Sequence, residues 1–180
     1  MPGFDALYKQ TVTLFNRVRV NQDGSEADYF IPRVLEGVHL IIDHGASWNT
    51  FGGAQTDNTR LHVRCTPSGS SVIIGGRFMY CEPKEWKELS DYSGMITFRY
   101  GNDTDFDFFI KGVYVPETEN LVDTIQVDGG NLTLDTGFID DSAYGKFGFY
   151  SHLNRVYDHV FAITQVSQYN LIPHFEIMAR

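Results

Sequence analysis

The sequence predicts an all-β protein, an antiparallel β-barrel or sandwich with a large inserted β-rich elaboration and one short helix. Apolar residues recur with a period of two along most of the chain, which is typical of strands. Glycine-containing turn signals separate these runs, as at Asp23-Gly24, Gly75-Gly76 and Asp128-Gly-Gly130. Many short strands separated by such turns indicate a barrel or sandwich. With 180 residues, 42% of them hydrophobic, we expect one core and one domain over residues 1–180.

The strands follow from the spacing of apolar residues. In the first run, 11–14, Val12 and Leu14 share one face of the predicted strand. The run 34–42 is apolar on both faces, which predicts a strand that is covered on both sides. The further strand candidates are 60–65, 72–79, 95–100, 106–115, 124–127, 147–150, 160–166 and 175–178.

One helix is predicted over 83–89. Pro83 lies in its first turn, where the missing N–H is tolerated, and Trp86 and Leu89 share a face at i, i+3. Because this helix has barely two turns, we expect it to close a barrel end or cover a sheet edge.

The charge pattern argues against a protein that grips nucleic acid. The chain has 14 basic and 23 acidic side chains, and its net charge is −9. Proteins that bind DNA carry basic patches, because the release of counterions drives that binding. The acidic residues instead form three groups: Asp23, Glu26 and Asp28; Asp103, Asp105 and Asp107; Asp135, Asp140 and Asp141. We therefore expect any contact with DNA to be repulsive.

No metal site is predicted. Asp103, Asp105 and Asp107 alternate and could supply oxygen ligands for Ca²⁺, but the glycine and the distal Glu of an EF-hand loop are absent. We interpret this segment as a turn and a solvated strand face that deters edge pairing. No two histidines are two, three or four residues apart, so no local pair of ligands is proposed. The six are His39, His44, His62, His152, His159 and His174.

Catalysis and bound cofactors are not predicted either. The sequence has no Gly-x-Ser-x-Gly turn, and Cys65 has the pattern of a small buried strand residue. The glycines at 75–76 and 129–130 match neither a phosphate-binding loop nor a dinucleotide fingerprint. We expect the protein not to be an enzyme.

Cysteines and hydropathy indicate the compartment. Cys65 and Cys81 are too few for a disulfide framework, which suits a reducing cytosol, although a bridge between the two is an open alternative. There is no apolar run of ~18 residues, and the first five residues lack the pattern of a signal peptide. We expect no membrane partner and a chain that stays where it is made.

The two ends of the chain share a further pattern. A short strand at Thr11-Val-Thr-Leu14 is followed by the charged loop Asn21–Asp28, after which Tyr29-Phe30 lead into the strand at 34–42. The closing segments, Phe161-Ala-Ile-Thr-Gln-Val166 and Phe175-Glu-Ile-Met-Ala179, have the forms aromatic-x-Ile-x-x-Val and apolar-Glu-Ile-x-Ala. In this order and at both ends, the chain resembles the head closure or head-tail joining (connector stopper) proteins of tailed bacteriophages.

The resemblance implies a small barrel built from about 8–43 and 155–180, with residues of about 44–150 as an insertion. It implies a structural component of the virion neck, assembled in the host cytoplasm as a homo-oligomeric, six- or twelve-fold ring. Such a ring would lie below the portal or adaptor protein, retain packaged DNA, and dock a tail terminator or tail protein from below. DNA would pass through without specific binding.

By analogy with the family, the loop with Asn21, Asp23, Glu26 and Asp28 would face the DNA channel. An acidic lumen suits this task, because a polyanion must slide through rather than adhere. The ten Tyr and fourteen Phe residues could serve the lateral interfaces of a ring, or could simply pack the barrel.

Other functions are compatible with the same residues. Within a virion, the chain could be a tail terminator or a capsid decoration protein, which would differ in symmetry from a stopper ring. Outside virion assembly, it could be a carbohydrate- or Ca²⁺-binding β-sandwich module in which Trp48, Trp86 or a tyrosine forms the sugar platform.

Overall fold

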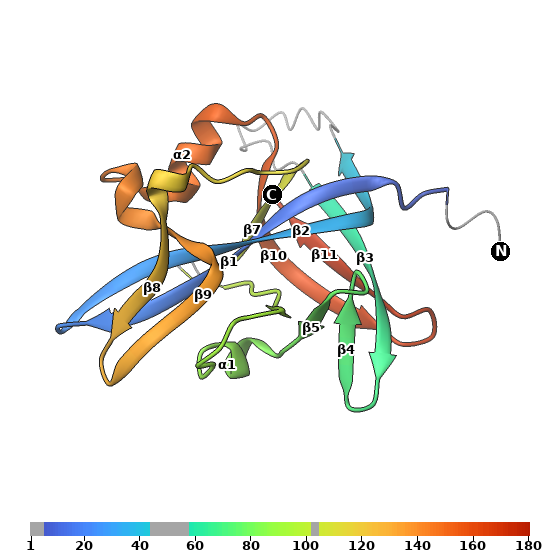
Figure 1. The fold of residues 1–180 in the computed structure, drawn as a ribbon. Helices are drawn as coiled ribbons and strands as arrows, with labels where there is room; N and C mark the ends of the chain where they lie inside the picture. Colours follow the sequence, from blue (N-terminus) through green and yellow to red (C-terminus); the bar gives the residue numbers. More distant parts are fainter. Residues whose placement is uncertain (1–5, 44–57, 102–104) are drawn as a thin grey trace.

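The fold is a closed, six-stranded antiparallel β-barrel with five further strands and two short helices (Figure 1). The computed structural model of the chain describes residues 6–43, 58–101 and 105–180. The barrel strands are β1 (Gln10–Gln22), β2 (Ser25–Asp43), β3 (Asn58–Ser68), β7 (Phe108–Lys111), β10 (Val160–Tyr169) and β11 (His174–Ala179). Their order is β3-β11-β10-β7-β1-β2, and pairing of β2 with β3 closes the ring of strands. The predicted all-β barrel with an inserted elaboration is confirmed.

The barrel is not confined to the two ends of the chain. The sequence predicts that it comes from about 8–43 and 155–180 alone, but β3 and β7 both lie inside the expected insertion. The reason is closure: β3 joins β2 to β11, and β7 joins β1 to β10. Without these two strands, two pairs of strand edges would remain unpaired.

The remaining strands extend the sheet from the barrel. β4 (Ser71–Ile74), β5 (Phe78–Tyr80) and β6 (Met95–Ile96) continue from β3, while β9 (Gly130–Asp140) and β8 (Leu121–Val127) continue from β2. The predicted strand at 72–79 is divided, because Gly75 and Gly76 both adopt positive φ and form the turn between β4 and β5. The predicted strands at 95–100 and 106–115 are shortened to β6 and β7.

Two short α-helices and two 3₁₀ turns complete the fold. The predicted helix at 83–89 is present as α1 (Pro83–Trp86), and the 3₁₀ turns are Thr118–Asn120 and Asp141–Tyr144. The predicted strand at 147–150 is wrong, because these residues begin α2 (Gly148–Val156). Phe149 and Leu153, about one helical turn apart, are both fully buried and pack in one cluster with Phe15 and Phe108 of the barrel. Within the described residues, no helix has the length and apolarity needed to cross a bilayer.

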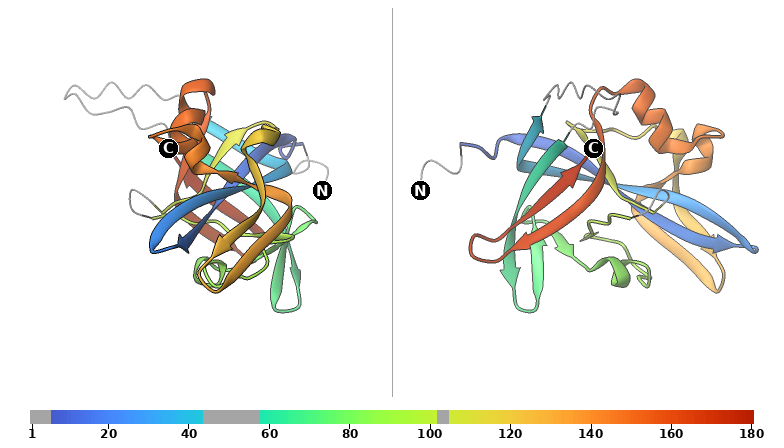
Figure 2. Two further views of the ribbon diagram at one scale, coloured as in Figure 1. Left: turned by 60° about the vertical axis from the view of Figure 1, so that its left-hand side comes forward. Right: turned by 180° about the vertical axis from the view of Figure 1, so that it is seen from behind.

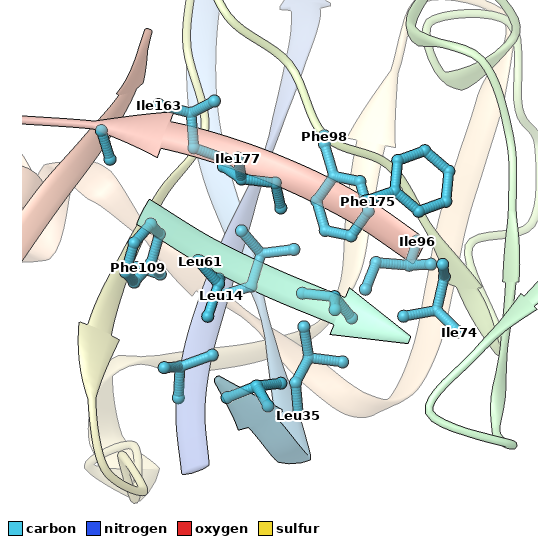
Figure 3. Close-up of a cluster of buried hydrophobic side chains, with 14 of the residues drawn as sticks. Leu14, Leu35, Leu61, Ile74, Ile96, Phe98, Phe109, Ile163, Phe175 and Ile177 are labelled. Atoms are coloured by element: carbon cyan, nitrogen blue, oxygen red, sulfur yellow. The ribbon is translucent and has the colours of Figure 1, made fainter. Parts of the chain in front are cut away.

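Burial on both faces distinguishes β1 from β2. Leu14 points into the barrel, where it packs with Leu61, Phe109 and Ile177 (Figure 3), and Phe15 on its other face packs against α2. The second half of β2, predicted to be covered on both sides, is covered on one side only. Ile41 is 39% exposed. Among the described residues, those outside the barrel therefore cover β1, while the outer face of the second half of β2 stays partly exposed.

Candidate functional site

Two hairpins project from the barrel side by side and form the double arm, which we define as residues 17–30 of β1 and β2 together with residues 117–141 around β8 and β9 (Figures 1 and 2). Asp23 and Gly24 both have positive φ, of 50° and 79°, in the two-residue turn that joins β1 to β2. This turn is bound to the second hairpin. The Asp128 N–H donates to the Asn21 carbonyl at 3.1 Å, and Gln22 Nε2 donates to the Gln126 carbonyl at 2.8 Å.

The double arm has a hydrophobic core of its own. Val18 and Tyr29 of the first hairpin pack with Ile125 and Phe138 of the second. Helix α1 adds Trp86, whose Nε1–H donates to the Arg17 carbonyl at 2.9 Å. Burial of apolar area on both hairpins fixes their relative position, so the acidic groups on their outer surfaces keep a defined spacing.

The surface of the double arm is strongly acidic. Residues 117–141 contain no Lys or Arg but contain seven carboxylates: Glu117, Glu119, Asp123, Asp128, Asp135, Asp140 and Asp141. Asp123, Asp128 and Asp135 are exposed, as are Asp23 and Glu26 on the neighbouring hairpin. A cleft of about 320 Å³ separates the Asp23 turn from β8.

The predicted channel loop is therefore one half of a larger surface. Asp128 is far from Asn21 in the sequence, and only the packing of the two hairpins and the pairing of β9 with β2 bring the two residues together. The absence of Lys and Arg over 25 successive residues, 117–141, is the sequence signal that could have found them.

Asp28 differs from the other predicted loop residues. Arg19 binds its carboxylate with two hydrogen bonds, of 2.8 and 2.9 Å, and Arg17 Nη1 lies 3.4 Å from it. The hydrogen bonds that Arg19 donates to the Asp28 carboxylate raise the pKa of Arg19. Asn21, Asp23 and Glu26 are exposed, whereas Asp28 is half-buried and its charge is compensated. The loop that the sequence predicts to face a channel thus offers the exposed charges of Asp23 and Glu26, of which Glu26 lies 4.0 Å from Arg19 Nε.

A buried ionic network joins the double arm to the barrel. Asp107 is fully buried and accepts hydrogen bonds from Asn16 Nδ2, from the main-chain N–H groups of Arg17 and Arg99, and from the Arg99 guanidinium, at 2.9–3.3 Å. Arg99 Nη1 also binds Asp105 at 2.9 Å, and Lys87 binds the other oxygen of Asp105 at 2.9 Å. The interpretation of 103–107 as a solvated strand face is wrong for Asp107; Asp103 lies outside the described residues.

The network opposes the effect of burial on both central groups. Burial raises the pKa of Asp107, and the Arg99 guanidinium and the surrounding N–H donors reduce that rise. Burial lowers the pKa of Arg99, but Asp107 and Asp105 more than offset this, so that it is raised. Asp107 Oδ1 lies 3.0 Å from Arg99 Nη2, and both Asp107 oxygens accept hydrogen bonds from N–H groups, which is the arrangement of an ion pair.

A second cluster lies on the outer surface of β2, β3 and β11. His39, His62 and His174 form a row in which successive ring centroids are 5.6 Å apart. The rings lie side by side, and the described residues contain no group of three His, Cys, Asp or Glu side chains placed to hold a metal ion. Burial lowers the pKa of His62, with Glu176 opposing and His174, His39 and Arg60 adding to the shift.

The remaining candidates are buried. Trp86 is 1% exposed, so it cannot serve as a sugar platform, and Trp48 lies outside the described residues. Cys65 and Cys81 are both free and buried, so the disulfide left open by the sequence is not formed. Burial raises the pKa of the Cys81 thiol to about 11, which keeps it protonated and unreactive at neutral pH.

Fold and site define a class: a six-stranded antiparallel barrel protein with a projecting acidic double arm. A family model matches residues 7–180, and the chain belongs to this family, described as Family of unknown function (DUF6751). No curated protein and no solved structure matches the chain.

Proposed function

We propose that this protein is a head closure (stopper) component of a tailed bacteriophage neck. In this role it forms a homo-oligomeric ring below the portal or adaptor protein, retains packaged DNA and docks the tail. The observation that carries the proposal is the double arm, a rigid projection whose exposed ionisable groups are almost all carboxylates.

Packaged DNA is a polyanion that the neck must first retain and then release. A basic lumen would bind phosphates through counterion release and hold the DNA in place. Carboxylates at Asp23, Glu26 and Asp128 would instead repel the backbone, so the DNA meets no adhesive site during exit. Because the double arm has its own packed core, it can bear this repulsion without collapsing onto the barrel.

The resemblance at the two chain ends gives the second line of support. The segments that carry it form β1, β2, β10 and β11, which belong to one barrel although they come from opposite ends of the sequence. A closed barrel leaves no strand edge of its own for chain-to-chain pairing. Ring contacts would therefore use side-chain surfaces on the outside of the barrel and on the double arm.

The test is a charge reversal of the double arm in the phage that encodes the chain. With Asp23→Lys, Glu26→Lys and Asp128→Lys combined, we expect normal particles and DNA content but at least a tenfold loss of infectivity, because DNA now adheres in the channel. Asp28 is left unchanged, since its reversal would break the Arg17 and Arg19 contacts. The matched control is Asp158→Lys, an exposed reversal outside the double arm.

Two results would contradict the proposal. One is wild-type infectivity of the reversed phage, and the other is the absence of the chain from purified virions. Native mass spectrometry of the purified protein adds the symmetry: a six- or twelve-fold ring is expected, whereas a trimer would indicate a decoration protein.

A further inference from the structure

The row of histidines belongs to a longer surface strip that crosses four strands. Tyr8 lies edge-on to His39 at 5.9 Å, and the row ends with Tyr169 stacked on His174 at 4.8 Å. We call Tyr8, His39, His62, His174 and Tyr169 the histidine strip. All five side chains are on the outer surface of the barrel, since the neighbouring residues in β2, β3 and β11 point into its core.

The histidine strip is flanked by exposed arginines. In β3, Arg60 lies two residues before His62 and Arg64 lies two residues after it. This strand contains no acidic residue. Arg64 also lies over the Tyr8 ring at 4.0 Å. Glu176 is the cross-strand partner of His62 and is the acidic group that faces the middle of the row. This side of the barrel thus combines arginines, histidines and tyrosines, with Glu176 and the exposed Asp43 at the end of β2 as neighbouring carboxylates.

Apolar residues continue the histidine strip at one end. The turn between β10 and β11 carries Leu171, which is 98% exposed, and Ile172, which is 58% exposed. Tyr169 in the same hairpin is 46% exposed. Aromatic rings and arginine bordered by exposed aliphatic groups are the composition that protein interfaces favour, whereas Lys, Glu and Asp are depleted there.

The histidine strip and the double arm lie at opposite sides of the molecule. In Figure 1 the β1–β2 and β8–β9 turns are at the left, while the β10–β11 turn is at the right; the view from behind in Figure 2 shows the same separation. Two complementary surfaces on opposite sides of one subunit are what a head-to-tail contact requires, and such contacts form a closed ring when the rotation between copies is suitable.

We propose that the histidine strip of each copy binds the acidic double arm of the next copy, and that this contact builds the ring. The inference rests on the proposed ring-forming function and names the surfaces that it uses. In this contact Arg60 and Arg64 of one copy would meet the exposed carboxylates Asp123 and Asp135 of the next copy, so complementary charge sets the register. The tyrosines and the Leu171 turn supply the apolar area.

The experiment reverses the charge of the histidine strip in one variant and the charge of the double arm in another. The strip variant combines Arg60→Glu with Arg64→Glu, and the arm variant combines Asp123→Lys with Asp135→Lys, so that Asp128, proposed to face the DNA, stays unchanged. By analytical ultracentrifugation and native mass spectrometry we expect each variant alone to be monomeric at concentrations at least tenfold above those at which the wild type forms rings. Arg155→Glu, an exposed reversal on α2, is the matched control and should form wild-type rings.

Mixing the two variants shows whether each fails to form rings because its charges no longer match or because it is misfolded. An equimolar mixture of strip and arm variants should form even-numbered rings of alternating copies, because each contact again joins opposite charges. Far-UV circular dichroism verifies that both variants are folded.

The outcomes distinguish the docking surfaces from the proposed function. If wild-type protein forms rings and the strip variant forms them equally well, the docking inference is wrong and the neck function stands. A wild type that stays monomeric at every concentration rejects the ring itself. A labelled duplex oligonucleotide that binds wild type but not the strip variant would assign the histidine strip to DNA and overturn the docking inference.

Discussion

At the scale of single residues, the main feature is a charge that the fold encloses completely. Asp107 has no solvent contact, and its two oxygens are surrounded by donors from β1 and from the segment that contains Arg99. Arg33 is a contrasting case: burial, with the nearby Arg77 adding, lowers its pKa to about 10. It donates to the Tyr92 carbonyl and lies over the Phe78 ring instead of binding a carboxylate. Asp107 is thus the group on which the junction between barrel and double arm depends.

Replacement of Asp107 by Asn should destabilise the protein by about 3–5 kcal/mol, because Arg99 would lose its buried counter-charge and keep only the partly exposed Asp105. The amide would also place an N–H₂ group among donors. Urea unfolding followed by tryptophan fluorescence measures the change, since Trp86 is packed beside the network. Asp158→Asn, at an exposed site, should lie within about 0.5 kcal/mol of wild type. An Asp107→Asn protein as stable as that control would show that the ion pair is not needed for folding.

At the scale of elements, α2 illustrates how a distant residue starts a helix. Gly148, its first residue, has a φ of +76°, and a Cβ there would lie 2.6 Å from Asp141 Oδ1. That carboxylate accepts the Phe149 N–H at 2.8 Å and so satisfies one of the free donors at the helix start. The helix then buries Phe149 and Leu153 against the barrel.

Gly148→Ala should therefore cost more than the usual penalty for a positive φ. The positive φ accounts for about 1–2 kcal/mol and loss of the Asp141 cap for about 1 kcal/mol more, a total of about 2–3 kcal/mol. Gly76→Ala is the matched control, since Gly76 has a φ of +65° but open space around a Cβ. Thermal unfolding of both variants gives the difference. Equal losses would mean that Asp141 moves aside without consequence.

The same elements show what the sequence could predict. The alternating runs in β3, β10 and β11 are each predicted, although shorter than the strands, because one face of each packs in the barrel and the other faces outward. The strand β9 is missed, although Leu132 and Leu134 alternate with Thr and Asp as in a strand, and both leucines pack in the core of the double arm. The start of α2 is mistaken for a strand, because a short aromatic run carries no period and the Asp141 cap comes from outside it.

The candidate site was predictable only in part, for a related reason. Asp23 and Glu26 are local to one turn, and Asp23-Gly24 identifies that turn directly. Their combination with Asp128 is not local, since it needs the second hairpin to lie against the first. Asp28 resembles its neighbours in sequence, and only the cross-strand position of Arg19 reveals that its charge is compensated.

At the scale of the whole molecule, charge is separated between two sides. Residues 117–141 carry seven acidic groups and no basic ones, while Arg60 and Arg64 border the histidine strip on the other side of the barrel. In the proposed ring, this separation would let the histidine strip of one copy attract the double arm of the next. Buried pairs such as Asp107 and Arg99 contribute to folding and take no part in this attraction.

Salt should therefore affect self-association much more than folding. The Debye length is about 10 Å in 0.1 M salt and about 3 Å in 1 M salt, so exposed charges are screened over this range while buried pairs are screened far less. Between 0.1 and 1 M NaCl we expect at least a tenfold rise in the apparent dissociation constant for ring formation, measured by sedimentation velocity. Over the same range, the urea midpoint of the arm variant, which is monomeric by design, should change little. Rings that persist or tighten in 1 M NaCl would mean that apolar contacts dominate, and Leu171 and Ile172 at the β10–β11 turn would then be the residues to replace.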